Sequence, residues 1–280
     1  MKTKVAVVTG SSSGFGLLTS LELAERGFQV IATMRNLDKG SLLLNKAKEL
    51  GVCEHIQLFE LDVTSEKSIL ACQRFLMEKF ASVDVLVNNA GYAGAGFAEE
   101  ISIGDYRMQF ETNVFGVIAV TQAILPMMRR QKAGKIINVS SISGKIAFPG
   151  LSPYNASKHA LEGFSESLRL ELKPFGIDVI LIEPGSFQTN IWTTGKQIAE
   201  PSLDPNSPYY HMMKSIETHL EKASPRYGDP AKAAKLIADI AEKHQPRLRY
   251  PIGKGVKLML ALKAILPWRA WEKLLLKQLK

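Results

Sequence analysis

Short apolar runs alternate with longer helical patterns along most of the chain, and this alternation restricts the fold more than any other feature. Six runs are nearly continuous in valine, isoleucine and leucine, as expected of parallel strands that are covered on both faces. They span residues 5–9, 29–33, 56–60, 83–87, 135–140 and 177–182. Helical patterns lie between or after them at 14–27, 38–50, 65–81, 103–131 and 153–174. The alternation predicts right-handed crossovers and a doubly wound parallel sheet.

Three glycines follow predicted helices at points where a left-handed residue commonly ends a helix. They are Gly51, Gly134 and Gly176. We expect each of them to be a helix C-cap.

A glycine-rich loop follows the first predicted strand and reads Thr9-Gly10-Ser-Ser-Ser-Gly14-Phe15-Gly16. Glycine lets the backbone turn tightly and approach a pyrophosphate, to which the N-terminus of the next helix offers amide donors and partial positive charge. A glycine triplet alone also serves plain turns. Here a strand precedes it and a helix follows, which is the context that dinucleotide binding requires.

The end of the second predicted strand bears on the choice of cofactor. An NAD site usually places an acid there for the ribose diol, whereas this chain has Thr33-Met34-Arg35-Asn36. Arg35 can pair with a 2′-phosphate, and Met34 offers no carboxylate to repel it. We therefore expect NADP(H) in preference to NAD(H). The alternative is that Arg35 is a solvated surface charge.

Tyr154 and Lys158 lie one helical turn apart at the start of a long helical pattern. This spacing places the phenol and the ammonium on one face. A free tyrosine has a pKa of about 10, and a neighbouring cation is expected to lower it. Tyr154 would then exchange a proton with an alcohol or a carbonyl.

Two further polar residues point to the same chemistry. Ser141 follows the fifth predicted strand, where its hydroxyl can orient a reacting oxygen. Asn113 interrupts a helical pattern in which it is a poor helix former, which suits a water-holding role beside Lys158. Each residue alone has an ordinary structural explanation. Their joint appearance in order after a glycine loop is what indicates an active site.

Together these motifs, with Asn88-Asn-Ala-Gly91 and Pro184-Gly185, resemble the short-chain dehydrogenase/reductase family over about residues 4–190. The resemblance implies a three-layer α/β/α Rossmann fold with a seven-stranded parallel sheet. It implies a catalytic tetrad of Asn113, Ser141, Tyr154 and Lys158. The expected cofactor-binding residues are Gly10, Ser12, Ser13, Gly14, Phe15, Gly16, Arg35, Asp62, Val63, Asn89, Ala90, Gly91, Tyr154, Lys158, Pro184, Gly185 and Thr189. Asp62 would lie near the adenine, and Pro184, Gly185 and Thr189 would cover the nicotinamide.

Within the family, residues 32–35, residues 157–168 and the basic C-terminus are similar to the 17β-hydroxysteroid and retinol dehydrogenase branch, and to bacterial oxidoreductases of unknown substrate. This likeness implies hydride transfer between NADP(H) and a carbonyl or secondary alcohol on a bulky, apolar small molecule. The alternative is a non-catalytic dinucleotide-binding sensor, because fold does not determine function. An epimerase or dehydratase is disfavoured by the glycine spacing and the short C-terminal region.

We expect residues 1–252 to form one dehydrogenase domain. Residues 186–228 break the strand–helix rhythm with four prolines, and a long insertion at this position lies over the carboxyl ends of the strands. We interpret them as a substrate lid, with a disordered surface loop as the alternative.

Residues 253–280 are expected to form a basic amphipathic extension of two helices that are split at Pro267. Residues 247–280 carry nine Lys or Arg and one acid, so the net charge of the whole chain, +8, belongs to this end. Trp268, Trp271, Leu275 and Leu279 share one face of the last helix. Such a helix can lie on an anionic membrane or pack on its own domain. No recognised nucleic-acid motif accompanies the charge, and we expect no nucleic-acid partner.

The two cysteines, Cys53 and Cys72, form no CxxC pair, so we expect neither a metal site nor a disulfide framework. Buried thiols, and the lack of a signal-peptide pattern or an apolar run long enough for a bilayer, favour a cytoplasmic protein with at most peripheral membrane contact. By resemblance, 103–131 and 153–174 are the expected contacts of a homodimer or homotetramer.

Overall fold

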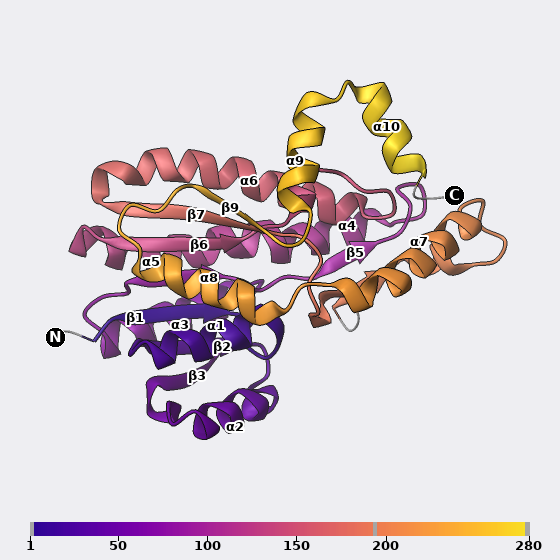
Figure 1. Ribbon diagram of the computed structural model, residues 1–280. Coiled ribbons are helices and arrows are strands. Elements are labelled where there is room, and N and C mark those ends of the chain that lie inside the picture. The colour runs from indigo at the N-terminus through magenta and orange to yellow at the C-terminus, as the bar shows by residue number, and fades with distance from the viewer. Residues whose placement is uncertain (1–2, 193–194, 278–280) are drawn as a thin grey trace.

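The computed structural model describes residues 3–192 and 195–277. One seven-stranded sheet runs through the molecule, with all neighbouring strands parallel and in the order β3-β2-β1-β4-β6-β7-β9. Helices cover both of its faces (Figure 1). The predicted doubly wound α/β/α fold is therefore confirmed. The strands are β1 (Val5–Thr9), β2 (Gln29–Met34), β3 (Ile56–Glu60), β4 (Val85–Asn88), β6 (Gly134–Val139), β7 (Ile177–Pro184) and β9 (Arg249–Ile252).

Two buried clusters lie on opposite faces of the sheet. Successive side chains of a strand point to opposite faces, so Ala6 and Val8 of β1 belong to one cluster and Val5 and Val7 to the other. This double burial explains why the strands are apolar at nearly every position. The first cluster includes side chains of α1 (Gly14–Glu25), α2 (Ser41–Glu49) and α8 (Pro230–Glu242); the second includes those of α3 (Glu66–Lys79), α5 (Gly116–Gln131) and α6 (Ser152–Leu172).

The single helix predicted over 103–131 is divided in the structure. It consists of α4 (Ile103–Phe110), a π-helical turn (Glu111–Phe115) and α5. The whole stretch is long and apolar enough to cross a membrane by length and composition, contrary to our expectation that no run would be. Val120, Ile124 and Met128 of α5 nevertheless pack in the core against the sheet, which accounts for this apolar character.

Two of the three predicted glycine C-caps are confirmed. Gly51 and Gly176 both have a φ of 70°, in the left-handed region. The prediction for Gly134 is wrong, because Lys132 ends α5 with a φ of 53°. Gly134 begins β6 instead, and a Cβ there would lie 2.7 Å from the sulfur of Met128.

The described residues of the segment 186–228 include regular secondary structure, so the alternative of a disordered loop is wrong. Lys196–Ile198 forms β8, which pairs in parallel with β5 (Ala93–Ala95) to make a second, two-stranded sheet. α7 (Tyr210–Ala223) follows and projects beyond the carboxyl ends of the strands (Figure 1). After β9, the chain ends in α9 (Val256–Ile265) and α10 (Trp268–Leu276). Leu279, predicted on the apolar face of the last helix, lies outside the described residues.

Candidate active site

A cavity of about 1020 Å³ opens at the carboxyl edge of the sheet. It lies where the strand order reverses between β1 and β4, the usual ligand crevice of a doubly wound sheet. Residues that directly follow five neighbouring strands or end the sixth line it. They are Gly10 after β1, Arg35 after β2, Leu61 after β3, Asn89 after β4, Ser140 after β6 and Pro184 at the end of β7.

The glycine loop leaves room for an anion at the N-terminus of α1. Gly10 and Gly14 have φ values of +69° and +56°, which residues with a side chain rarely adopt. A Cβ on Gly16 would lie 2.3 Å from the carbonyl oxygen of Gly10, so only glycine fits there. The first turn of α1 carries no acidic side chain that would repel a phosphate. The loop therefore fits the pyrophosphate of a dinucleotide.

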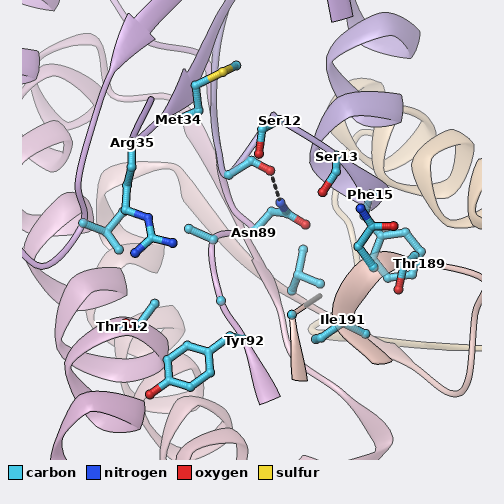
Figure 2. Close-up of a pocket in the computed structure, with 18 of the residues that line it drawn as sticks. Ser12, Ser13, Phe15, Met34, Arg35, Asn89, Tyr92, Thr112, Thr189 and Ile191 are labelled. Carbon is cyan, nitrogen blue, oxygen red and sulfur yellow. Dashed lines mark hydrogen bonds between the residues drawn. The ribbon is translucent and has the colours of Figure 1, made fainter. Parts of the chain in front are cut away.

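Hydrogen bonds of Asn89 connect the loop after β4 to the glycine loop. Its Nδ2 donates to the carbonyl oxygens of Thr9 at 2.9 Å and Gly10 at 3.1 Å. In return, Thr9 Oγ1 accepts from the backbone N–H groups of Asn89 at 2.9 Å and Ala90 at 3.0 Å. Figure 2 shows Asn89 in the centre of the pocket wall, next to the Ser12–Ser13 turn. These bonds hold two walls of the crevice at a defined separation.

Two cations lie at the end of the cavity beside β2. Arg35 and Lys39 both line it, and Figure 2 shows the guanidinium of Arg35 extending into the pocket. The carboxylate of Asp62 also lines this end, where it accepts hydrogen bonds from the backbone N–H and hydroxyl of Thr64 at 2.9 and 2.7 Å. No acid follows β2 directly, as the sequence Met34-Arg35-Asn36 predicted. The residues present fit a nucleotide that carries a further phosphate on its ribose.

Tyr154, Lys158 and Ser141 meet at the opposite end of the cavity. Tyr154 and Lys158 lie in the first turns of α6, and Ser141 follows β6. A side-chain hydrogen bond joins Tyr154 to Ser141. The ammonium of Lys158 donates to the carbonyl oxygen of Val139 at 2.8 Å and lies 5.7 Å from the centre of the Tyr154 ring. All three side chains are buried.

Burial dominates the acidity of this cluster. It raises the pKa of Tyr154 to about 12, which the hydrogen bond from Ser141 offsets only in part. It also lowers the pKa of Lys158 to about 8, while the charge of Glu162 opposes that change. The expectation that Lys158 holds the pKa of Tyr154 below its usual value is therefore wrong for the protein alone. Low dielectric disfavours both charged forms, so the phenol is protonated at neutral pH.

Asn113 lies beside the cavity but does not line it. Its Nδ2 donates to the carbonyl oxygen of Tyr92 at 3.0 Å and to Ser157 Oγ at 3.3 Å, and its Oδ1 accepts from the Tyr92 N–H at 3.2 Å. Asn113 lies in the π-helical turn, where the helix departs from regular α geometry, and its bonds reach residues outside that turn. Asn113 thus positions the loop after β4 against α6. A water-holding role stays a prediction.

The structure brings the predicted site residues together with two exceptions. Every one of them lines the cavity except Gly16 and Asn113. Gly16 packs against the lining residue Gly10, and Asn113 bonds the lining residue Tyr92. Several other side chains line the cavity that the sequence motifs did not predict, among them Tyr92, Met108, Thr112, Phe187 and Ile191. Tyr92 directly follows Asn88-Asn-Ala-Gly91, and Phe187 and Ile191 begin the predicted lid, so adjacency to these motifs was an available signal.

Comparisons with known proteins agree with this geometry. Residues 4–198 match the short chain dehydrogenase family. An uncharacterized oxidoreductase, YusZ of Bacillus subtilis, is 50% identical over all of this chain and 99% of its own length. Retinol dehydrogenase 8 of Bos taurus is 33% identical over 94% of this chain and 86% of its own.

Solved structures show the same relationship. A short-chain dehydrogenase from Streptomyces avermitilis superimposes with a TM-score of 0.83 at 34% identity, covering 98% of this chain and 97% of the other. A single-residue variant of actinorhodin polyketide ketoreductase, solved with NADPH, has a TM-score of 0.76 at 30% identity, covering 91% and 97%. The chain belongs to the short-chain dehydrogenase/reductase family of oxidoreductases.

Proposed function

We propose that this oxidoreductase uses NADP(H) to interconvert a bulky apolar ketone and its secondary alcohol. The observation that carries the proposal is the meeting of Tyr154, Ser141 and Lys158 in one cavity with the glycine loop. A sensor that only binds a dinucleotide needs no buried phenol hydrogen-bonded to a serine at the far end of its cavity. When bound, the nicotinamide would supply or accept the hydride.

Tyr154 is suited to donate a proton to a carbonyl oxygen. Its raised pKa keeps the phenol protonated at neutral pH. The Ser141 hydroxyl can bond the same carbonyl oxygen and orient it. When the proton leaves, the Lys158 ammonium, which lies 5.7 Å from the centre of the Tyr154 ring, would stabilise the resulting phenolate. The reverse transfer would serve alcohol oxidation.

The preference for NADP(H) rests on Arg35 and Lys39, and a ketoreductase of the same fold carries NADPH. A hydrogen bond to a charged group contributes about 1.5–3 kcal/mol, which corresponds to a factor of roughly 10–150 in affinity. Arg35→Ala should therefore weaken NADPH binding by about that factor and NADH binding by less than threefold. Fluorescence titration of both cofactors measures this. Lys48→Ala, an exposed change on α2 outside the cavity, is the control. Equal losses for both cofactors would exclude a 2′-phosphate contact.

The apolar substrate is supported by the side chains at the open part of the cavity. Met108, Phe187 and Ile191 line it, and the last two belong to the segment 186–228 that we propose as a lid. NADPH consumption should be measured with ketones of increasing apolar size at equal concentration. We expect kcat/KM to rise with apolar bulk. Turnover limited to small polar ketones would overturn the substrate class. Binding of NADPH without turnover of any ketone would instead support the sensor.

Self-association and cytoplasmic location stay predictions. The helices that the family resemblance points to expose large apolar side chains, including Phe115 next to α5 and Leu170 on α6, with exposed fractions of 53% and 78%. Sedimentation velocity of the purified protein would distinguish a monomer from a dimer or tetramer.

A further inference from the structure

The C-terminal extension is a fixed part of the molecule. Trp271 of α10 is 1% exposed and packs in one cluster with Val256, Ile142 and Ile146. Ile142 directly follows Ser141, and a Cβ on the cavity residue Gly185 would lie 2.6 Å from Val256. The α9–α10 hairpin is therefore anchored beside the active site. Figure 1 shows that its other side extends away from the body of the protein.

The outer side of this hairpin carries apolar side chains that nothing in the described chain covers. Leu258 and Ile265 of α9 are 64% and 78% exposed, and Trp268 at the start of α10 is 63% exposed. Leu258 and Ile265 are seven residues apart and so lie on one face of α9, with the exposed Ala261 between them. Large apolar side chains gathered on one outward face commonly mark an interaction site.

Basic side chains are close in the sequence to these exposed apolar residues. Lys254 precedes α9, Lys257 is its second residue, Arg269 and Lys273 follow Trp268, and all four are exposed. Residues 253–280 contain seven basic residues and a single acid, whereas residues 1–246 hold equal numbers of both. Lys263 lies 4.3 Å from the ring of Trp268 and 5.4 Å from that of Trp271, which holds the turn between the helices. The positive charge is thus concentrated around the exposed apolar residues.

We propose that the outer face of α9 and the start of α10, centred on Leu258, Ile265 and Trp268, docks on an anionic lipid bilayer. Apolar and indole side chains enter the boundary between headgroups and acyl chains, while lysine and arginine meet the anionic headgroups. A second copy of this chain fits less well, because two basic faces would repel each other. Docking in this way would place the cavity near the membrane surface.

Co-sedimentation with vesicles tests this proposal. The full chain should bind vesicles of phosphatidylglycerol and phosphatidylcholine in equal parts at least tenfold more tightly than vesicles of phosphatidylcholine alone. High salt should reduce the difference, because it screens charges outside the protein. The double variant Leu258→Ser/Ile265→Ser should lose at least tenfold in partition while its circular dichroism is unchanged. Met77→Ser, an exposed apolar position on α3 outside the expected subunit contacts, is the control and should bind as the wild type does.

Two results would overturn the proposal. One is equal partition of the wild type into both kinds of vesicle, or into neither. The other is sedimentation velocity showing a wild-type oligomer that the double variant dissociates, without any loss of vesicle binding. Neither measurement depends on turnover, so the proposed reaction and the proposed docking can fail independently.

Discussion

Arg249 compensates two buried carboxylates, and its replacement should destabilise the protein in a pH-dependent way. Its Nε lies 2.9 Å from Glu162 Oε2 and 3.2 Å from Glu183 Oε1, and its Nη2 lies 2.6 Å from Glu166 Oε1. The side chains of Glu162 and Glu183 are only 4% and 2% exposed. Two other cations act on Glu162: Lys145 lies 3.3 Å from its carboxylate, and Lys158 interacts with it electrostatically. Arg249→Met keeps the apolar stem of the side chain and removes the guanidinium that contacts Glu162, Glu166 and Glu183.

The expected size of the effect follows from these contacts. Removing one partner of a buried ion pair lowers the free energy of unfolding by about 3–5 kcal/mol. Part of this cost depends on pH through Glu183, because burial and the nearby Glu162 raise the pKa of Glu183 to about 7. Glu183 is therefore mostly charged at pH 7.5 and protonated at pH 5.5. It needs the guanidinium only at the higher pH, so the cost of removing Arg249 is smaller at pH 5.5.

Urea unfolding followed by circular dichroism at both pH values measures this loss. Arg247→Met is the control, since Arg247 is exposed and lies 5.2 Å from the ring of Tyr250, a contact that contributes less than about 1 kcal/mol. We expect the Arg249→Met variant to lose about 3–5 kcal/mol at pH 7.5 and a smaller amount at pH 5.5. An equal loss at both pH values, or a loss below about 1 kcal/mol at pH 7.5, would refute the reasoning.

Three further predictions concern single positions. Gly16→Ala should weaken NADPH binding by more than tenfold in a fluorescence titration, because the added methyl group meets the carbonyl oxygen of Gly10; an unchanged Kd would contradict this. Trp271→Ala should cost about 3–5 kcal/mol of unfolding free energy, and Trp268→Ala less than about 1 kcal/mol, because only Trp271 is buried. Because the folded-state pKa of Glu183 is raised, its contribution to stability falls as pH rises from about 4.5 to about 7. Glu183→Gln should flatten the pH dependence of urea unfolding over that interval, and an unaltered profile would oppose the assignment.

Local sequence patterns predicted the parts of this fold that depend on local physics. Continuous apolar runs predicted six strands of the large sheet, which are β1, β2, β3, β4, β6 and β7. The glycine loop was predicted from residues that are close together in the sequence. No apolar run predicted β9, because its sequence Arg-Tyr-Pro-Ile is short and contains Pro251. Only the family resemblance supplied a seventh strand. Its partner β7 lies far back in the chain, and such pairing carries no local signal.

The active site, too, was predictable only where it depends on residues close together in the sequence. The spacing of Tyr154 and Lys158 predicted that both side chains share one face, and the structure agrees. Their pKa values depend on burial by the rest of the fold, which spacing does not encode. The π-helical turn around Asn113 depends on bonds to Tyr92 and Ser157, and those bonds form only when α6 packs beside it.

The ion cluster around Arg249 was missed for a similar reason. Its members come from α6, β7 and β9, and each one alone reads as an ordinary charged residue. Only the folded structure shows that the carboxylates of Glu162 and Glu183 lie beside the same guanidinium.

The direct test of the central claim separates binding from turnover at Tyr154. Tyr154→Phe removes the phenolic oxygen and keeps the ring. A general acid contributes about 10²–10⁴ in rate, so kcat for ketone reduction should fall by at least a hundredfold while the Kd for NADPH changes less than threefold. Tyr106→Phe is the matched control, since the Tyr106 hydroxyl bonds Ser152 at 2.6 Å and neither residue lines the cavity. Turnover by Tyr154→Phe within tenfold of the wild type would contradict the assignment of Tyr154 as the proton donor.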